Sequence, residues 1–322
     1  MYLHRLGGRD GEFPFGGLAA DGAGGYLGTS DLGGDVGFGS IFQVKADGSV
    51  ILLHSFGDIK AEGDQPLGHL VRDDAGNFYG TNSEGGPVTA GFGTIFKLDP
   101  DNNLTTLYSF SGGADGWAPT SGLTLDADGN VYGTTQLGGG VNGCVGLGCG
   151  TVYQLTPTGQ LNVLHTFEGG SADGADPTAG VTRKSDGSLY GATRYGGGGP
   201  CNDSGKRGCG VIFKISKSGQ YTVLHRFAGT DGSDVETDLA LDTSGTIYGV
   251  ATRGGSNRCP PFGCGVLFSL TPAGVFKGVH AFTGKPDGSS PLGLGRFENG
   301  QLYGSTNSGG ARGLGSIFRF KP

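Results

Sequence analysis

The chain repeats one short phrase six times, and this repetition limits the possible architecture more than any other feature. Each copy has a small or aromatic residue, a glycine and a Gly-Gly pair a few positions later, as in VYGTTQLGG from Val131. The first glycines of the six copies are Gly28, Gly80, Gly133, Gly191, Gly249 and Gly304. Their spacings of 52, 53, 58, 58 and 55 residues predict a propeller or a solenoid. Glycine makes up 71 of the 322 residues and no helical periodicity is sustained, which excludes a helical solenoid.

Each repeat contains four short strand-like segments. In the third repeat they are residues 122–126, 131–135, 151–155 and 161–167, which are rich in β-branched, leucine and aromatic residues. Turns such as DADGN and TPTGQ predict tight hairpins between the first and second segments and between the third and fourth. The two other connections are long. The long loops should therefore emerge on one face, where we expect any functional site.

The ends of the chain predict how the ring closes. The fourth segment carries the phrase LHxF, as in LHSF from Leu53, and its sixth copy is LHRL from Leu3, at the N-terminus. We therefore predict a six-bladed β-propeller with four-stranded blades, in which residues 2–6 pair with residues 316–320. Closure of this kind removes an open sheet edge. Residues 1–322 would form one domain, which we expect to be a monomer.

The phrase LYGTTxxGGxxGxGTIFKL, followed by LHSF and DG..P, resembles the bacterial GloVer-type tandem repeats. The resemblance covers essentially the whole chain. It implies a propeller-like protein that is exported from the cell. It implies no activity, and no catalytic residue can be transferred from it.

The net charge and the cysteine content limit which cellular compartments and which partners we expect. The net charge of −7 argues against a nucleic-acid partner, and no apolar run is long enough to span a membrane. No signal peptide precedes the first strand, and we interpret Met1 as replacing a removed export signal. The six cysteines form local pairs: Cys144/Cys149, Cys201/Cys209 and Cys259/Cys264. We predict three disulfides and an extracellular or periplasmic location, with zinc binding as the alternative.

Residues that recur in every repeat are predicted to be structural. The histidines of the fourth segment share one position, and Tyr108 occupies it in the remaining copy. They are His4, His54, His165, His225 and His280. A second periodic set is predicted to stabilise the loops between blades through Asx-type turns. Its members are Asp10, Glu62, Asp115, Asp173, Asp231 and Asp287. Calcium binding at these residues is the alternative, although the ligand spacing of a calcium loop is missing.

Departures from the repeat are the better candidates for function. One position before the inner strands reads Gly17, His69, Gly122, Gly180, Asp238 and Leu294. His69 and Asp238 would face each other across a six-bladed ring, near the mouth of its channel. They are a candidate acid/base or metal pair. The alternative is that both line a channel filled with water.

Basic residues form the second departure. The long loops of the fourth and fifth repeats carry, in an acidic protein, Arg194, Lys206, Arg207, Arg253 and Arg258. Arginine suits carboxylate, sulfate or phosphate, so Arg194 and Arg253 are predicted to bind substrate, with Glu236 beside them and Tyr195 as a proton-transfer group. The alternative is ordinary ion pairing with Asp203, Asp234 or Glu236. Trp117, the single tryptophan, is a candidate sugar platform or a loop plug.

Three functions are compatible with these residues. The first is an enzyme acting on an anionic saccharide at the channel mouth. As a lyase it would use an arginine to neutralise a uronate while His69 or Tyr195 moves the proton; as a hydrolase it would use Asp238 and Glu236. The second is a non-catalytic module that binds a glycan or a protein. The third is a metal-dependent hydrolase, similar to six-bladed lactonases and phosphotriesterases with channel calcium, although glycine predominates at the channel position here.

Overall fold

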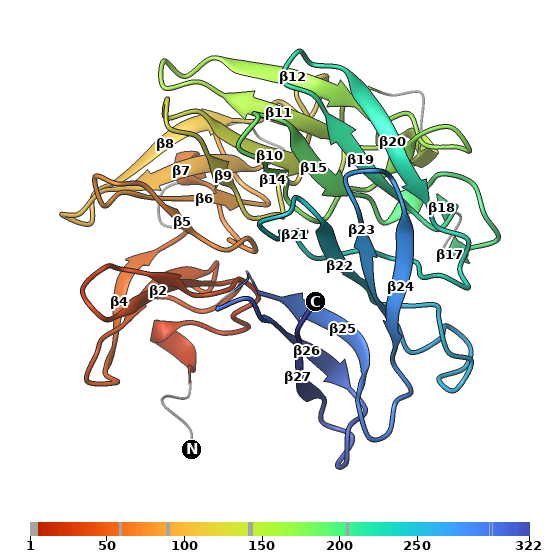
Figure 1. Cartoon of the computed structure of the whole chain (residues 1–322). Coiled ribbons are helices and arrows are strands. Elements are labelled where there is room, and N and C mark those ends of the chain that lie inside the picture. Colours follow the sequence, from red (N-terminus) through yellow and green to blue (C-terminus); the bar gives the residue numbers. More distant parts are fainter. Residues whose placement is uncertain are drawn as a thin grey trace. The chain divides into compact units, whose positions relative to one another are not determined.

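A computed structural model describes residues 6–57, 60–87, 91–140, 144–203, 206–295, 297 and 299–322. The chain divides into two compact units: residues 1–141 with 150–166, and residues 142–149 with 167–322. Each unit contains three antiparallel sheets that are blades of a β-propeller (Figure 1), and the second unit also contains two two-stranded sheets. The described residues also include three short 3-10 helices, Gly8–Asp10, Lys60–Glu62 and Cys144–Gly146. That residues 1–322 form one domain stays a prediction.

The first unit holds blades one to three. Blade one has the order β1 (Ala19–Ala20), β2 (Tyr26–Ser30), β3 (Ser40–Val44) and β4 (Val50–Ser55). Blade two has the order β5 (Val71–Arg72), β6 (Phe78–Asn82), β7 (Thr94–Leu98) and β8 (Leu104–Ser109). Blade three has the order β9 (Thr124–Leu125), β10 (Val131–Thr135), β11 (Thr151–Leu155) and β12 (Leu161–Thr166). The four segments predicted for the third repeat are confirmed, with the first one shorter than expected.

The second unit holds blades four to six. Blade four has the order β14 (Thr182–Arg183), β15 (Leu189–Ala192), β19 (Val211–Ile215) and β20 (Tyr221–Arg226). Blade five has the order β21 (Ala240–Leu241), β22 (Ile247–Ala251), β23 (Val266–Leu270) and β24 (Phe276–Ala281). Blade six has the order β25 (Ser289–Leu294), β26 (Leu302–Ser308) and β27 (Ser316–Phe320). Two short pairs lie in the loops: β13 (Gly174–Ala175) with β16 (Tyr195–Gly196), and β17 (Asn202–Asp203) with β18 (Lys206–Arg207).

The recurring glycine of each blade makes room for an aromatic ring on the neighbouring strand. The six pairs are Gly28↔Phe42, Gly80↔Phe96, Gly133↔Tyr153, Gly191↔Phe213, Gly249↔Phe268 and Gly304↔Phe318. A Cβ built on any of these glycines would collide with its partner's ring. Glycine is therefore required here for space, and the ring restores the packing that the missing side chain gives up.

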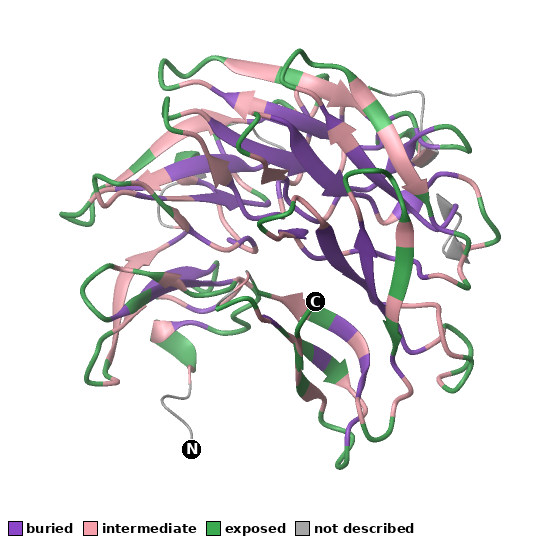
Figure 2. Ribbon diagram, in the orientation of Figure 1, coloured by how far each residue is buried: buried purple, intermediate pink, exposed green. Residues whose placement is uncertain are grey.

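The phenylalanine of each LHxF phrase completes the core. Strands such as β10 and β22 are buried along their whole length (Figure 2). Phe56, Phe110, Phe167, Phe227 and Phe282 are at most 2% exposed. Each ring packs on the glycine-paired aromatic that comes next in the chain. Their centroid separations are 5.2–5.3 Å, for Phe56–Phe96, Phe110–Tyr153, Phe167–Phe213, Phe227–Phe268 and Phe282–Phe318. One glycine and two aromatic rings thus form the repeating unit of the core.

The three predicted disulfides are confirmed. They join Cys144 to Cys149, Cys201 to Cys209 and Cys259 to Cys264. The second cysteine of each pair occupies a position that is phenylalanine in the first two blades, Phe38 and Phe92. Those rings cover Gly57 and Gly112, and the sulfur atoms cover the corresponding glycines, Gly169, Gly229 and Gly284. A disulfide therefore replaces an aromatic ring as the apolar cover of the loop.

The predicted closing strand cannot be compared with the structure. Residues 1–5, with most of the predicted strand and His4, lie outside the described residues. The pairing of residues 2–6 with residues 316–320 therefore stays a prediction.

Candidate functional site

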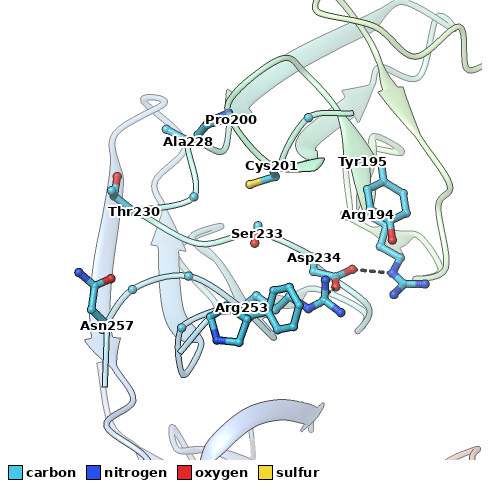
Figure 3. Close-up of a pocket in the computed structure, with 17 residues that line it drawn as sticks. Arg194, Tyr195, Pro200, Cys201, Ala228, Thr230, Ser233, Asp234, Arg253 and Asn257 are labelled. Atoms are coloured by element: carbon cyan, nitrogen blue, oxygen red, sulfur yellow. Dashed lines mark hydrogen bonds and ion pairs between the residues drawn. The ribbon is translucent and has the colours of Figure 1, made fainter. Parts of the chain in front are cut away.

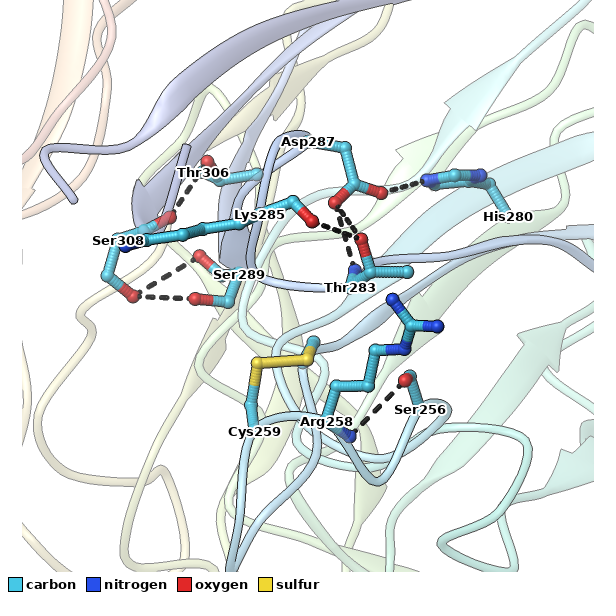
Figure 4. Close-up of a disulfide and its surroundings, with 11 residues drawn as sticks. Ser256, Arg258, Cys259, His280, Thr283, Lys285, Asp287, Ser289, Thr306 and Ser308 are labelled. Atoms are coloured by element: carbon cyan, nitrogen blue, oxygen red, sulfur yellow. Dashed lines mark hydrogen bonds and ion pairs between the residues drawn. A yellow bond between two sulfur atoms is a disulfide. The ribbon is translucent and has the colours of Figure 1, made fainter. Parts of the chain in front are cut away.

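His54, His225 and His280 each contact one of the periodic carboxylates, which sequence reasoning did not predict. His54 Nε2 lies 3.1 Å from Glu62 Oε2, and His280 Nε2 lies 2.8 Å from Asp287 Oδ2 (Figure 4). His225 contacts Asp231 in the same way at 2.9 Å, and the Tyr108 hydroxyl donates to Asp115 at 3.0 Å. Each carboxylate thereby ties the fourth strand to the loop that follows it. These residues support the fold, as the repetition predicted.

His69 and Asp238 each lie against a glycine of an adjacent blade. A Cβ at Gly122 would overlap the imidazole ring of His69. Asp238 Oδ1 accepts a hydrogen bond from the Gly180 N–H at 2.7 Å. Both side chains are half-buried. Because His69 belongs to the first unit and Asp238 to the second, their action as a pair stays a prediction.

Trp117 packs as part of a loop in the first unit. Its backbone exchanges two hydrogen bonds with Leu137, at 2.8 and 3.0 Å. Its indole meets the Phe92 ring edge to face, with the centroids 5.5 Å apart. This environment resembles the loop plug more than the sugar platform. Its role in binding stays untested.

The structure brings Arg194, Tyr195 and Arg253 together around one pocket of the second unit (Figure 3). The pocket measures about 310 Å³ and lies between the long loops of blades four and five. Its wall also includes Ser233 and Asp234, which sequence reasoning did not select as site residues. Asp238 and Glu236 are not among the residues that line it.

Tyr195 and Arg253 occupy the same repeat position in successive blades. Tyr195 pairs with Ala175 through β16 and β13, and Arg253 forms the corresponding bridge with Ser233. Blades one and three have leucine at this position, Leu32 and Leu137. Blades two and six have Glu84 and Ser308 there, so the residue at this position varies among the blades, and it is a phenol and a guanidinium in the two adjacent blades that form the pocket.

Asp234 holds the two arginines in place. Its side chain is 5% exposed, and its Oδ1 accepts a hydrogen bond from Arg194 Nε at 2.5 Å. Its Oδ2 lies 3.2 Å from Arg253 Nε. Arg194 Nε also lies 2.8 Å from Glu236 Oε1. Charge-assisted contacts of this kind pre-organise guanidinium groups. The ion pairing that was the alternative to anion binding is therefore present.

Two carboxylates, Asp234 and Glu236, accompany the two arginines. Two guanidiniums share the single buried carboxylate of Asp234, which leaves one positive charge among the three groups. Glu236 is close enough to neutralise it, but desolvation raises the pKa of Glu236, and the neighbouring Asp234 raises it further. Arg194 and Arg253 oppose that rise. Burial thus makes the charged form of Glu236 more costly.

Aromatic rings support both guanidiniums. The Arg194 Cζ lies 5.3 Å from the centroid of the Tyr195 ring, and the Arg253 Cζ lies 4.5 Å from that of Phe262. Tyr195 is 7% exposed and Phe262 is 56% exposed, so Phe262 offers an open apolar surface at the pocket. The Cys259–Cys264 disulfide brackets Phe262 and limits the freedom of its loop.

One feature of the sequence could have identified Asp234 as a candidate site residue. The repeat places a residue with positive φ before a proline, as at Gln65, Ala118 and Asp176. Aspartate tolerates this left-handed conformation better than most residues. In the fifth copy Asp234 has a φ of 64° and is followed by Val235 instead of proline. The absence of this proline is the sequence feature that distinguishes Asp234 from its counterparts in the other repeats.

Of the remaining basic residues, Arg258 lies outside the pocket. Its backbone N–H bonds to Ser256 Oγ at 3.3 Å (Figure 4). Lys206 and Arg207 lie on β18, where only the backbone is described. In the described part of the chain, no group of three His, Cys, Asp or Glu side chains is placed to hold a metal ion. No helix there is long and apolar enough to cross a bilayer.

Comparisons with known proteins agree with the fold. The family model of the Gloeobacter/Verrucomicrobia repeat matches residues 1–144, 75–260 and 198–322. A search of curated protein sequences gives no match. Among solved structures, a gluconolactonase from Xanthomonas campestris is 16% identical with a TM-score of 0.52, covering 98% of this chain and 88% of its own. A luciferin-regenerating enzyme is 13% identical with a TM-score of 0.51, covering 98% and 93%. At these identities the similarity shows the fold alone.

Proposed function

The chain belongs to the Gloeobacter/Verrucomicrobia repeat family, and from that premise we propose that its function resides in the residues that depart from the repeat. Residues that every blade shares are needed for folding. Residues that differ from the repeat and lie together at one place therefore indicate a functional requirement. We propose that the pocket of blades four and five binds an anionic saccharide. The convergence of Arg194, Tyr195 and Arg253 on that pocket carries the proposal.

The chemistry of the pocket supports a sugar acid as the ligand. Arginine presents a planar set of donors that matches a carboxylate, and Asp234 orients both guanidiniums. Phe262 provides an apolar surface for the C–H face of a sugar ring. A few convergent polar groups beside an aromatic wall are typical of small-molecule sites.

We also propose that the protein works outside the cytoplasm, in the periplasm or the extracellular space. Three disulfides support this proposal, since such bonds persist in oxidising compartments. Saccharides bearing uronate groups would be encountered there as free chains or at the cell surface.

Calorimetric titration with uronate oligosaccharides, and with neutral oligosaccharides of equal length, tests the binding proposal. The uronate set should contain galacturonate, glucuronate, mannuronate and guluronate chains. We expect at least one uronate chain to bind, and Arg253→Met to weaken that binding by about tenfold or more, the value of one charge-assisted contact. Arg258→Met is the matched control, because Arg258 is in the same loop and does not line the pocket.

Two outcomes would overturn the proposal. One is that no uronate chain binds. The other is that Arg253→Met and Arg258→Met have the same affinity as the unaltered protein.

A further inference from the structure

We propose that the pocket cleaves its uronate chain by β-elimination, with Tyr195 as the group that removes and returns the proton. This inference rests on the proposed function, because it needs a uronate held by Arg194 and Arg253. It adds an activity to what would otherwise be a binding site.

The position of Tyr195 is the first support. Pairing of β16 with β13 fixes its backbone, and its ring packs beside the Arg194 guanidinium, with 5.3 Å between Cζ and the ring centroid. Arg253 lines the same pocket from the next blade. The same repeat position is leucine in blades one and three and polar in blades two and six, Glu84 and Ser308. Tyr195 adds to it a ring that supports Arg194 and a hydroxyl that can exchange a proton.

The second support is that few side chains at the pocket could act as a base. Among the described residues that line it, only Tyr195 and Asp234 have side chains with an ionisable oxygen. Asp234 holds both arginines, which occupies its two oxygens. Hydrolysis of a glycoside needs two carboxyl groups on opposite sides of the bond, and the pocket does not offer them. Elimination needs one base and a cation that neutralises the carboxylate.

The reaction balances without any further reactant. A guanidinium pairs with the uronate carboxylate, which makes the C5 hydrogen more acidic, and the phenolate takes that proton. The electron pair forms a C4=C5 double bond, and the C4–O bond of the glycoside breaks. The departing oxygen then receives the proton from the phenol. A guanidinium beside a phenol stabilises the phenolate through its charge, as such a base requires.

The test uses the uronate chain that binds best in the titrations. Elimination produces an unsaturated sugar whose conjugated double bond absorbs in the ultraviolet, whereas hydrolysis does not. We expect the unaltered protein to generate this absorbance and Tyr195→Phe to lower its rate by about 100-fold or more, the usual contribution of a proton-transfer group. Tyr195→Phe should bind the chain within about threefold of the unaltered protein, since it keeps the ring beside Arg194.

Tyr190→Phe is the matched control, because this tyrosine is also buried in blade four but does not line the pocket. It should retain the full rate. A chain that binds and is left intact, or cleaved without a double bond, would overturn the elimination while leaving the binding proposal standing. An equal rate in Tyr195→Phe and the unaltered protein would exclude Tyr195 as the base. Absence of any binding would instead reject the proposed function itself.

Discussion

At the scale of single residues, Tyr153 is the exception in the repeating core. The other five copies have phenylalanine opposite the recurring glycine, whereas Tyr153 has a hydroxyl that is fully buried. In the described structure this hydroxyl has no hydrogen-bond partner. Desolvation strongly raises the pKa of Tyr153, so the group stays a neutral phenol. A buried polar group without a partner costs free energy.

Tyr153→Phe should therefore leave the free energy of unfolding unchanged or raise it by about 1 kcal/mol. The reverse change at the matching position, Phe213→Tyr, should lower it by about 1–3 kcal/mol. Urea titrations followed by tryptophan fluorescence measure both values. A Tyr153→Phe protein that is clearly less stable would show that the hydroxyl is satisfied.

The recurring glycines allow a second prediction at this scale. Gly249→Ala should lower the free energy of unfolding by about 1–3 kcal/mol, because the new methyl group overlaps the Phe268 ring. Gly278→Ala is the control in the same blade, since a Cβ there meets only an ordinary contact with Val266. Phe268→Leu added to Gly249→Ala should recover part of the loss. Equal effects of the two alanine variants would argue against steric crowding as the reason for the glycine.

At the scale of elements, either an aromatic ring or a disulfide packs over a glycine of each loop that joins one blade to the next along the chain. Phe92 covers Gly112 in blade two, and the Cys144–Cys149 disulfide covers Gly169 after blade three. Replacing both cysteines by serine should cost about 2–3 kcal/mol of unfolding free energy. Cys144→Ala combined with Cys149→Phe should lose less, because the ring restores the apolar cover. Thermal unfolding of the two double variants would distinguish them, and an equal loss in both would mean that the crosslink alone matters.

The contact between strand and loop also predicts how stability depends on pH. Burial alone would raise the pKa of Asp231, but hydrogen bonds from His225 and from the Ala228 N–H outweigh it and lower that pKa. A lowered carboxyl pKa stabilises the fold above the unfolded value of about 4 and loses this contribution as the pH falls through the folded value.

Asp231→Asn should thus lower the free energy of unfolding by about 1 kcal/mol at pH 7. In acid, the difference in unfolding free energy between this variant and the unaltered protein should become smaller. Asp101→Asn, at an exposed turn, is the control and should have little effect at either pH. Denaturant titrations at pH 7 and in acid provide the comparison. A difference in unfolding free energy that stays constant with pH would contradict a stabilising role for the Asp231 carboxylate.

At the scale of the whole molecule, blade six has three strands among the described residues, while the other five blades have four. The displaced phrase LHRL from Leu3 predicts that the N-terminal segment supplies the missing strand. Deletion of residues 1–8 should then expose the edge of β27, lowering the melting temperature and promoting aggregation. Light scattering during heating measures both effects. A shortened protein that matches the full chain in both would reject closure by the N-terminus.

The sequence by itself determined the blade count, the strand positions, the turns and the cysteine pairs. These depend on contacts close in sequence or repeated six times, such as the hairpin between residues 151–155 and 161–166 and the cysteines of a single loop. The tertiary structure decided which side chains meet. It paired His225 with Asp231 and the recurring glycines with aromatic rings. It also placed Asp234 between Arg194 and Arg253. The contacts of Asp234 with the two arginines join loops of successive blades whose paths depend on glycines with positive φ, and one sequence does not specify those paths.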